Sequence, residues 1–403
     1  MILIKTIFIL FKYNTPYYSY KKDLLMSKPF ALLFFLTLTT LTYATMENTT
    51  CKKCHPLIFA EYQNSIHSKA SIFKDPVHKA VWDKHPAKAK NNYKCAKCHT
   101  PSDHALISGK RTLAENPIQQ NEPISCQACH TIESIESHTK ANKNRFTEKK
   151  KYFFSADEAK KGTKVVFKEE SHFLGLFKTK VGSPYHDIDY GNEGYYNGDA
   201  CMGCHSHKQN GKGFVICDLE VSKGDSKESC ISCHMPKTQG SLANQIHTAT
   251  HAFHGASIHN SSTKMLSKYI VLSLEKEADG FVVAIHNQAT HTLFPQPLRL
   301  NQLRVEIERE GKTMALAPQN FLRIIGTNGK PSMPWLATEV LKDSTIKAHE
   351  VRKVAFKTPL KKGDVVTLKF GYYLVNPKAA QKLGITEKRA TTFITLTKKR
   401  IQL

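Results

Sequence analysis

Hydrophobic and polar positions alternate in the last third of the chain. Ile270, Leu272 and Leu274 are each separated by one residue, and the same spacing of two recurs over residues 366–370 and 393–396. The turn-forming sequences Ala-Asp-Gly, Thr-Asn-Gly-Lys and Lys-Lys-Gly-Asp interrupt this pattern. Alternation between such turns is typical of antiparallel strands with one buried face. We expect residues 263–403 to form an all-β, sandwich-like C-terminal domain of about seven strands.

The preceding region follows a different period. Ile58, Tyr62, Ile66 and Phe73 recur at nearly helical spacing, and a shorter pattern of this kind includes Ile132 and Ile135. Residues 45–262 are therefore predicted to be an α-rich domain with little regular strand. The lysine-rich stretch at 139–170 is typical of a solvated surface, and a face that docks a partner is the alternative.

An apolar run from Phe30 to Leu41 follows Lys28 and precedes the small residues around Ala44. This arrangement predicts a secretory signal peptide within residues 1–44, with an overlong start before Met26; an uncleaved anchor is the alternative. The bulk of the chain is then exported to the periplasm, either soluble or associated with a membrane. Although the formal charge is +24, export argues against nucleic acid as the partner.

The chain has 11 cysteines, and ten of them belong to five copies of the motif C-x-x-C-H. The cysteine pairs are Cys51 and Cys54, Cys95 and Cys98, Cys126 and Cys129, Cys201 and Cys204, and Cys230 and Cys233. Two thiols at this spacing can form thioethers to one edge of a haem, while the next residue, histidine, binds the iron. Zinc sites and disulfides do not require a histidine directly after every second cysteine.

The motifs therefore predict five covalently bound haem c groups. The expected proximal iron ligands are the five motif histidines, His55, His99, His130, His205 and His234. The eleventh cysteine, Cys217, is flanked by apolar residues and is expected to be a small core residue. Haem propionates would neutralise part of the positive charge, and the remainder could attract acidic redox partners or a small anionic substrate.

Several segments resemble cytochromes of the multihaem cytochrome c-554 type. These are "CKKCHPLIFAEYQNSIHSKA", "CAKCHTPSD", "SCQACHTIESIESH", "SPYHDIDY", and "CISCHMPK" followed by "HAFHGA", in the same order over residues 51–256. The resemblance implies that the second axial ligands of the irons include His67, His138, His186 and His251. His254 lies three residues after His251 and is the alternative at that site.

A fifth candidate lies in the predicted β domain, in "NQATHTLFPQPLR". This segment resembles an Asn-x-x-Gly-His-x-x-Pro element found in the C-terminal domain of several multihaem cytochromes, with Thr290 in place of the glycine and Pro295 one position later. The resemblance implies that His291 reaches back to a haem. A histidine buried beside Phe294 and Pro295 also needs a polar partner, which iron would supply.

Five motifs and five distal histidines together predict a periplasmic electron-transfer cytochrome with bis-histidine haems. The alternative is an enzyme that uses one open haem to convert a small nitrogen or sulfur compound. Pentahaem nitrite reductase, which has a lysine in place of one motif histidine, fits poorly because all five motifs here end in histidine; the hydroxylamine oxidoreductase type keeps the histidines. Expected partners are redox proteins, such as a quinol-oxidising membrane protein or a terminal reductase, with the β domain as a docking module.

Overall fold

The computed structural model describes residues 46–149, 152–173, 177–222, 228–244, 246–255 and 265–403. The predicted signal peptide at 1–44 lies outside these ranges. Thr45–Leu403 form one compact unit, so the predicted boundary at residues 262 and 263 stays a prediction. No helix in the described ranges is both long enough and apolar enough to cross a membrane.

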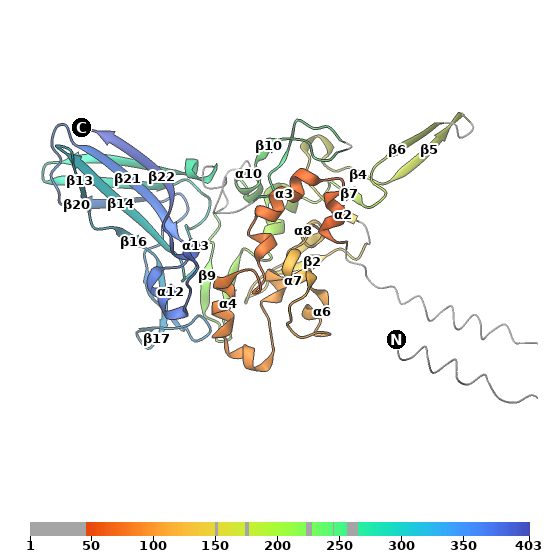
Figure 1. Ribbon diagram of the computed structural model, residues 1–403, viewed down its shortest axis with the longest axis horizontal. Helices are drawn as coiled ribbons and strands as arrows, with labels where there is room; N and C mark the ends of the chain where they lie inside the picture. The colour runs from red at the N-terminus through yellow and green to blue at the C-terminus, as the bar shows by residue number, and fades with distance from the viewer. Residues whose placement is uncertain (1–45, 150–151, 174–176, 223–227, 245, 256–264) are drawn as a thin grey trace, which may run out of the picture. The chain divides into compact units, whose positions relative to one another are not determined.

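The first part of this unit consists of short helices joined by long loops (Figure 1). Proline starts several of them at the first helical position, where its missing N–H is not needed. The helices are α2 (Asn48–Lys52), α3 (Pro56–Asn64), η1 (His67–Lys69), α4 (Pro76–Asp83), η2 (Pro86–Lys90), α5 (Ala96–His99), α6 (His104–Ile107), α7 (Pro117–Asn121), α8 (Cys126–His130), η3 (Glu158–Lys160), α9 (Gly194–Asn197), η5 (Asp199–Cys201) and α10 (Cys230–His234).

This region also contains more strand than its sequence predicted. Its strands are β1 (Ile132–Glu136), β2 (Lys143–Phe146), β3 (Tyr152–Phe154), β4 (Lys164–Val165), β5 (Lys168–His172), β6 (Phe177–Val181), β7 (Asp187–Asp189), β8 (His207–Gln209), β9 (Val215–Asp218), β10 (Lys237–Gln239) and β11 (Thr250–Ala252). They form two-stranded pairs and one three-stranded sheet, β3-β7-β4. Strands this short and polar lack the alternation by which the C-terminal strands were recognised.

The C-terminal region is rich in strands, as predicted. One antiparallel sheet has the order β12-β13-β20, and a second has the order β15-β14-β21-β22 with β16 also paired to β14. A third, smaller sheet has the order β18-β17-β19. The bounds are β12 (Ile270–Glu277), β13 (Gly280–Asn287), β14 (Leu300–Arg309), β15 (Lys312–Ala315), β16 (Gln319–Phe321), β17 (Arg323–Thr327), β18 (Lys330–Pro331), β19 (Glu339–Asp343), β20 (Val351–Phe356), β21 (Val365–Tyr373) and β22 (Ile394–Gln402).

The alternation at residues 270–274, 366–370 and 393–396 falls in β12, β21 and β22, and the three predicted turns lie between or next to strands. The described residues from 265 onward contain eleven strands rather than about seven, because the short strands β15 to β19 have no clear alternation. Two helices, α12 (Pro377–Leu383) and α13 (Lys388–Thr391), lie between β21 and β22, and η6 (Ser267–Tyr269) precedes β12.

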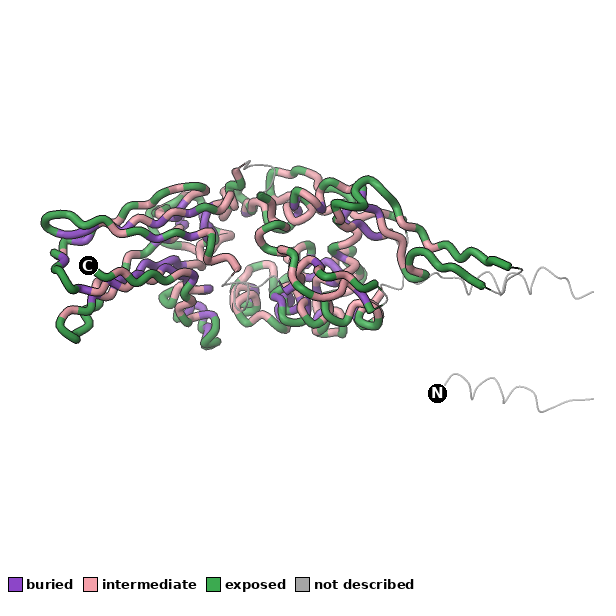
Figure 2. The backbone as a smooth tube through the Cα atoms, turned by 90° about the horizontal axis from the view of Figure 1, so that it is seen from above, coloured by how far each residue is buried: buried purple, intermediate pink, exposed green. Residues whose placement is uncertain are grey.

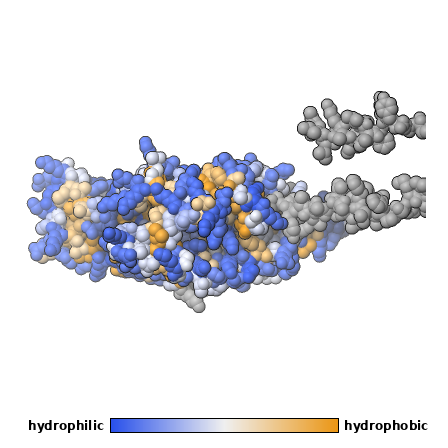
Figure 3. Space-filling model, turned by 90° about the horizontal axis from the view of Figure 1, so that it is seen from below, coloured by the Kyte–Doolittle hydropathy of each residue, from blue (hydrophilic) through white to orange (hydrophobic). Residues whose placement is uncertain are grey.

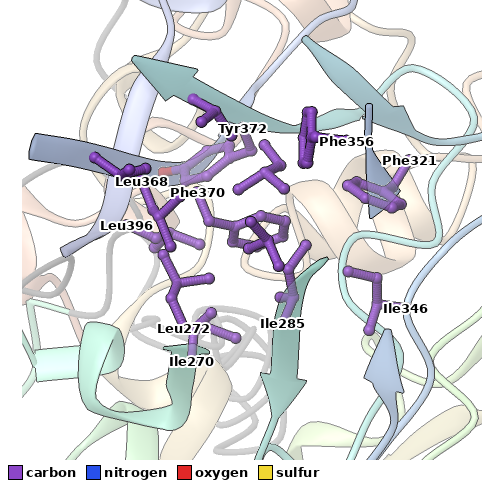
Figure 4. Close-up of a cluster of buried hydrophobic side chains, with 14 of the residues drawn as sticks. Ile270, Leu272, Ile285, Phe321, Ile346, Phe356, Leu368, Phe370, Tyr372 and Leu396 are labelled. Atoms are coloured by element: carbon purple, nitrogen blue, oxygen red, sulfur yellow. The ribbon is translucent and has the colours of Figure 1, made fainter. Parts of the chain in front are cut away.

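The two larger C-terminal sheets bury one common hydrophobic core. Leu272 and Ile285 come from the first sheet, and Leu368, Phe370 and Leu396 come from the second. Their side chains point toward one another between the strands (Figure 4). Two antiparallel sheets that share a core in this way are the arrangement of a β-sandwich.

Asp364 supplies a buried charge at the edge of this core. Its carboxylate accepts hydrogen bonds from Arg309 Nε at 2.8 Å and Nη2 at 2.7 Å, and from the backbone N–H of Lys361 at 2.8 Å. The Arg309 guanidinium lowers the pKa of Asp364 to about 2. We expect Asp364→Ala to lower the free energy of unfolding by about 2 kcal/mol, because it leaves Arg309 without its paired carboxylate.

Urea unfolding followed by circular dichroism measures this loss. A folded-state pKa below the ordinary value of 3.8 means that the stabilisation is complete above the ordinary pKa and disappears as the pH falls toward 2. The difference between wild type and variant should therefore shrink over that acid range. Glu308→Gln, at the exposed pair of Glu308 with Arg400, is the matched control and should change stability by less than about 0.5 kcal/mol. An equal effect of both substitutions would contradict the prediction.

The helical and strand-rich regions contact each other through hydrogen bonds at several points. Asn210 donates from Nδ2 to the carbonyls of Pro334 and Ala337, and Arg323 donates to the carbonyl of Val215. Buried residues follow the β strands and the interior of the helical region (Figure 2). On the face seen in Figure 3, hydrophobic side chains form separate patches within a mainly hydrophilic surface.

Candidate metal centres

Each of the five C-x-x-C-H motifs folds into one helical turn. The backbone N–H of His55, His99 and His205 donates to the carbonyl of the first cysteine of its own motif, at 2.8, 3.0 and 3.0 Å. The third and fifth motifs form α8 and α10, in which the Ser125 and Ser229 side chains cap the first turn. Residues three and four apart share one face of a helix, so both thiols and the histidine of each motif point to the same side. This is the local geometry that covalent haem attachment needs.

Four motif histidines each face a second histidine ring across a similar gap. The ring centroids are 6.3 Å apart for His55 and His186, 6.0 Å for His205 and His67, 6.2 Å for His130 and His254, and 6.3 Å for His234 and His291. Two imidazoles that bind one metal ion at metal–nitrogen distances of about 2 Å place their centroids roughly 6 Å apart. All four separations therefore leave room for one iron.

Hydrogen bonds orient several of these rings. Nδ1 lies 2.8 Å from the Leu242 carbonyl in His55, 2.7 Å from the Phe154 carbonyl in His130, and 2.7 Å from the Ala252 carbonyl in His254. In His291 it lies 3.0 Å from the carbonyl of Thr292. A carbonyl can only accept, so Nδ1 carries the proton and Nε2 keeps its lone pair. Histidines that bind metals are commonly held in this way by a second partner.

Burial favours the neutral form in six of the eight paired imidazoles. Burial lowers the pKa of His67, His234 and His254 to about 4, and it also lowers the pKa of His130, His186 and His205. A metal ligand must be unprotonated, and these histidines meet that requirement at neutral pH without losing a proton on binding.

His254, rather than His251, is the ring opposite His130. Both nitrogens of His251 face oxygen acceptors, with Nδ1 3.0 Å from the Gly240 carbonyl and Nε2 3.0 Å from Glu61 Oε1. Both nitrogens are therefore occupied by oxygen partners of the chain, and the His251 ring faces no motif histidine in the ring contacts of the described residues. The resemblance favoured His251. Both histidines occur in one short segment, and only the fold decides which of the two rings turns toward the motif.

Glu61 connects this arrangement to the first motif. It lies on α3, the helix that begins directly after His55. Its Oε2 accepts a 2.8 Å hydrogen bond from the backbone N–H of His254. One carboxylate therefore holds both the His251 ring and the backbone that carries the His254 ring. Nothing in the spacing of the sequence indicated this role for Glu61.

His138 lies between β1 and β2, away from the five motif histidines in the ring contacts of the described residues. Its Nδ1 accepts a hydrogen bond from the backbone N–H of Lys140 at 3.1 Å, and its carbonyl lies 3.0 Å from His207 Nε2. The structure thus places it in a local turn. The resemblance of this segment to multihaem cytochromes implied His138 as a ligand, but in the structure the ring opposite His130 is that of His254.

The second motif differs from the other four. The His99 ring lies only 3.9 Å from the His78 ring, which is too close for an iron between them. Both rings direct Nδ1 at the same carbonyl, that of Ala70, at 3.2 Å for His99 and 3.1 Å for His78. His78 Nε2 lies 3.3 Å from the Tyr93 hydroxyl. His78 therefore stands beside His99, on the same side of the metal position, and not across from it.

His291 lies in the loop between β13 and β14, and both regions of the chain hold this loop. On the helical side, the Thr292 N–H donates to the Leu219 carbonyl at 2.9 Å and the Thr292 hydroxyl donates to Glu220 at 2.6 Å. On the β side, Asn287 Nδ2 donates to the carbonyls of His291 and Lys347 at 3.0 and 2.7 Å. These contacts keep the His291 ring opposite His234.

Thiol contacts show which motifs are neighbours. Cys51 lies within hydrogen-bonding reach of Cys126, Cys98 of Cys204, and Cys201 of Cys230. The Cys129 thiol lies close enough to raise the pKa of both Cys201 and Cys204, in addition to the larger effects of Cys230 or Cys98 and of burial. The first motif thus neighbours the third, the third neighbours the fourth, and the fourth neighbours both the second and the fifth.

These sites fit covalent haem better than zinc or disulfides. All 11 cysteines are free thiols, and no group of three or more His, Cys, Asp and Glu side chains in the described ranges could hold a metal ion. Ten thiols on five helical turns, each with a histidine on the same face, match the attachment of haem c. In each motif, both thiols and the histidine lie on one face of a helical turn.

Comparison with known proteins supports this chemistry. Residues 50–131, which contain the first three motifs, match the family model "Cytochrome c554 and c-prime". This match, together with the five attachment motifs, supports a multihaem c-type cytochrome of this kind. Among curated proteins none matches the cytochrome in sequence. A solved penta-heme cytochrome c552 from Thermochromatium tepidum has a similar fold, with a TM-score of 0.66 and 20% identity, over 88% of this chain and 99% of that one.

Glu61 provides a test of how this cytochrome positions its histidines. We expect Glu61→Ala to release the His254 backbone, so that the His254 ring is held less firmly opposite His130 of the third motif. Outer partners of metal ligands typically contribute roughly 10–100-fold to the affinity of a site. Electron paramagnetic resonance should show part of one low-spin signal becoming high-spin, with a shifted midpoint potential. The control is Glu115→Ala, at an exposed carboxylate bonded to Gln120. A spectrum identical to wild type would show that Glu61 has no positioning role.

Proposed function

We propose that this cytochrome is an exported, five-haem electron carrier with four bis-histidine sites and one site that is open on its distal side. The bis-histidine pairs are His55 with His186, His130 with His254, His205 with His67, and His234 with His291. The open site is that of His99. The observation that carries the proposal is the contrast between ring separations of 6.0–6.3 Å in the four pairs and 3.9 Å between His99 and His78.

Two axial imidazoles suit electron transfer because they leave no position for a substrate and change little with redox state. The chain buries the histidines and directs Nε2 at the metal position. It also holds the attachment sites beside one another, in the order that the thiol contacts show. Haem c, when bound, supplies the redox-active iron. The predicted signal peptide supports an exported location, and redox proteins remain the expected partners.

The spin states of the oxidised protein test the count directly. We expect electron paramagnetic resonance and visible spectra to show four low-spin sites for each high-spin site, with five haems per chain by mass spectrometry. His78→Ala should leave the low-spin count unchanged, because His78 lies beside His99. Five low-spin sites in the wild type would overturn the open site, and a loss of one low-spin site in His78→Ala would assign His78 as a distal ligand.

The geometry at His99 also favours a second candidate function, in which the open site binds a small molecule. Burial raises the pKa of the nearby Cys95 thiol, and the hydrogen bond with Cys204 lowers the pKa of Cys98. The charge of Lys208 lies close enough to both thiols to favour their ionised forms. A positive charge at this position suits an anion. Nitrite, hydroxylamine and tetrathionate are the probes. A spectral change of the high-spin signal without turnover would indicate binding only, and steady turnover would indicate an enzyme.

A further inference from the structure

The strands β5 and β6 pair with each other and are exposed to solvent. All ten residues of the two strands are exposed, and the hairpin extends away from β4 and β7 (Figures 1 and 2). A two-stranded hairpin that packs on nothing else has marginal stability in water. Its exposure therefore suggests that another surface covers it when the protein works.

The two faces of this hairpin differ in chemistry. On one face Glu169 pairs with Lys178 at 2.7 Å and with Lys180 at 3.5 Å. Strand residues two apart share a face, so Phe177 and Val181 lie on the other side. At the end of the hairpin the rings of Phe173 and Phe177 contact each other edge to face, with centroids 6.1 Å apart. This side also carries Lys168, Glu170 and His172, so the hairpin combines an ionic face with a face of mixed character and an aromatic end.

The aromatic end is among the most exposed hydrophobic surface in the described chain. Phe173 is 79% exposed and Phe177 is 65% exposed, and Val166, Val181 and Tyr185 of the same segment are between 46% and 54% exposed. Two exposed aromatic rings in contact with each other, near further exposed apolar residues of the same segment, are typical of a site of interaction with a protein or a membrane. Scattered single residues would not require such an explanation.

Charge favours a lipid surface over a second copy of the chain. Residues 149–181 contain nine lysines and four acidic residues, a net charge of +5. Two such segments would repel each other, whereas anionic lipid headgroups attract lysines. Most of this charge lies in residues 149–164, just before the hairpin. Aromatic side chains beside a lysine-rich segment match the boundary between headgroups and acyl chains.

We propose that the β5–β6 hairpin binds the cytochrome to an anionic membrane surface by inserting Phe173 and Phe177. The hairpin leads directly into a candidate ligand, since His186 follows Val181 by five residues and faces His55. The first motif lies at one end of the order given by the thiol contacts. Membrane binding would therefore present this end to a membrane donor or acceptor, a consequence that rests on the proposed function.

Flotation with lipid vesicles tests the proposal on the intact holoprotein. We expect the wild type to float with vesicles of phosphatidylcholine and phosphatidylglycerol, to bind weakly to phosphatidylcholine alone, and to be released as salt is raised. The double variant Phe173→Ser with Phe177→Ser should bind at least roughly tenfold more weakly, because two aromatic side chains no longer leave water. Met314→Ser, at a 43% exposed residue of another hairpin, should bind like the wild type.

The outcomes separate this proposal from the proposed function. Absence of flotation by the wild type, or equal flotation by the double variant, would overturn membrane binding. A fall in the sedimenting mass of the double variant without lipid binding in the wild type would assign the hairpin to a second copy and also overturn the proposal. Spin-state counts on the same samples test the haem sites independently and show that each variant has folded. Phe177→Ser alone is the fallback if the double variant does not fold.

Discussion

His291→Ala is expected to convert one of the four low-spin sites into a high-spin site. The His291 ring lies 6.3 Å from that of His234, with an angle of 25° between the rings, and its Nδ1 is held by the Thr292 carbonyl. Alanine removes the imidazole but leaves the loop contacts of Thr292 and Asn287 in place. Spin quantification should therefore show the low-spin content falling by about a quarter. The high-spin content should rise by the same number of spins.

His349→Ala is the matched control for this variant. His349 is another histidine of the C-terminal region, and its Nε2 lies 3.1 Å from the Ser222 hydroxyl, in the segment that also holds the His291 loop. It faces no motif histidine in the ring contacts of the described residues, so its removal should leave every spin state unchanged. An unchanged spectrum in His291→Ala would show that His291 is an ordinary loop residue and that the fifth motif has another ligand or none.

Replacing Cys201 and Cys204 together by serine is expected to divide the electron-transfer array. Their thiols lie beside Cys230 and Cys98, and they are also the neighbours of Cys129. The fourth motif therefore connects the first and third motifs to the second and fifth. The variant should retain four haems by mass spectrometry. Rapid-mixing reduction should separate into more than one phase, because the first and third sites, the second site and the fifth site no longer neighbour one another.

The equivalent change at the first motif, Cys51 and Cys54 to serine, is the control. It also removes one attachment site, but one at the end of the order, where Cys126 is the neighbouring motif thiol in the recorded contacts. Its four remaining sites should be reduced together in a single phase. Single-phase reduction in both variants would contradict the central position of the fourth motif.

The attachment motifs and the C-terminal strands could be predicted because both depend on local sequence. Cysteines three apart and a histidine one position later share a face of a single helical turn, whatever surrounds it. The alternation of Leu272 and Leu274, or of Leu368 and Phe370, likewise records which side of a strand is buried. The identity of the cofactor and the existence of a β region therefore followed from the residues alone.

The choice of distal histidine depends on contacts between residues far apart in the chain. His251 and His254 are indistinguishable by spacing, and Glu61, about 190 residues earlier, decides which ring turns toward His130. His138 is near the third motif in sequence but lies in a local turn. His78 lies beside His99, where both rings direct Nδ1 at the Ala70 carbonyl. Periodicity describes the buried face of one element and carries no information about which element lies across a gap of roughly 6 Å, which only the packed chain determines.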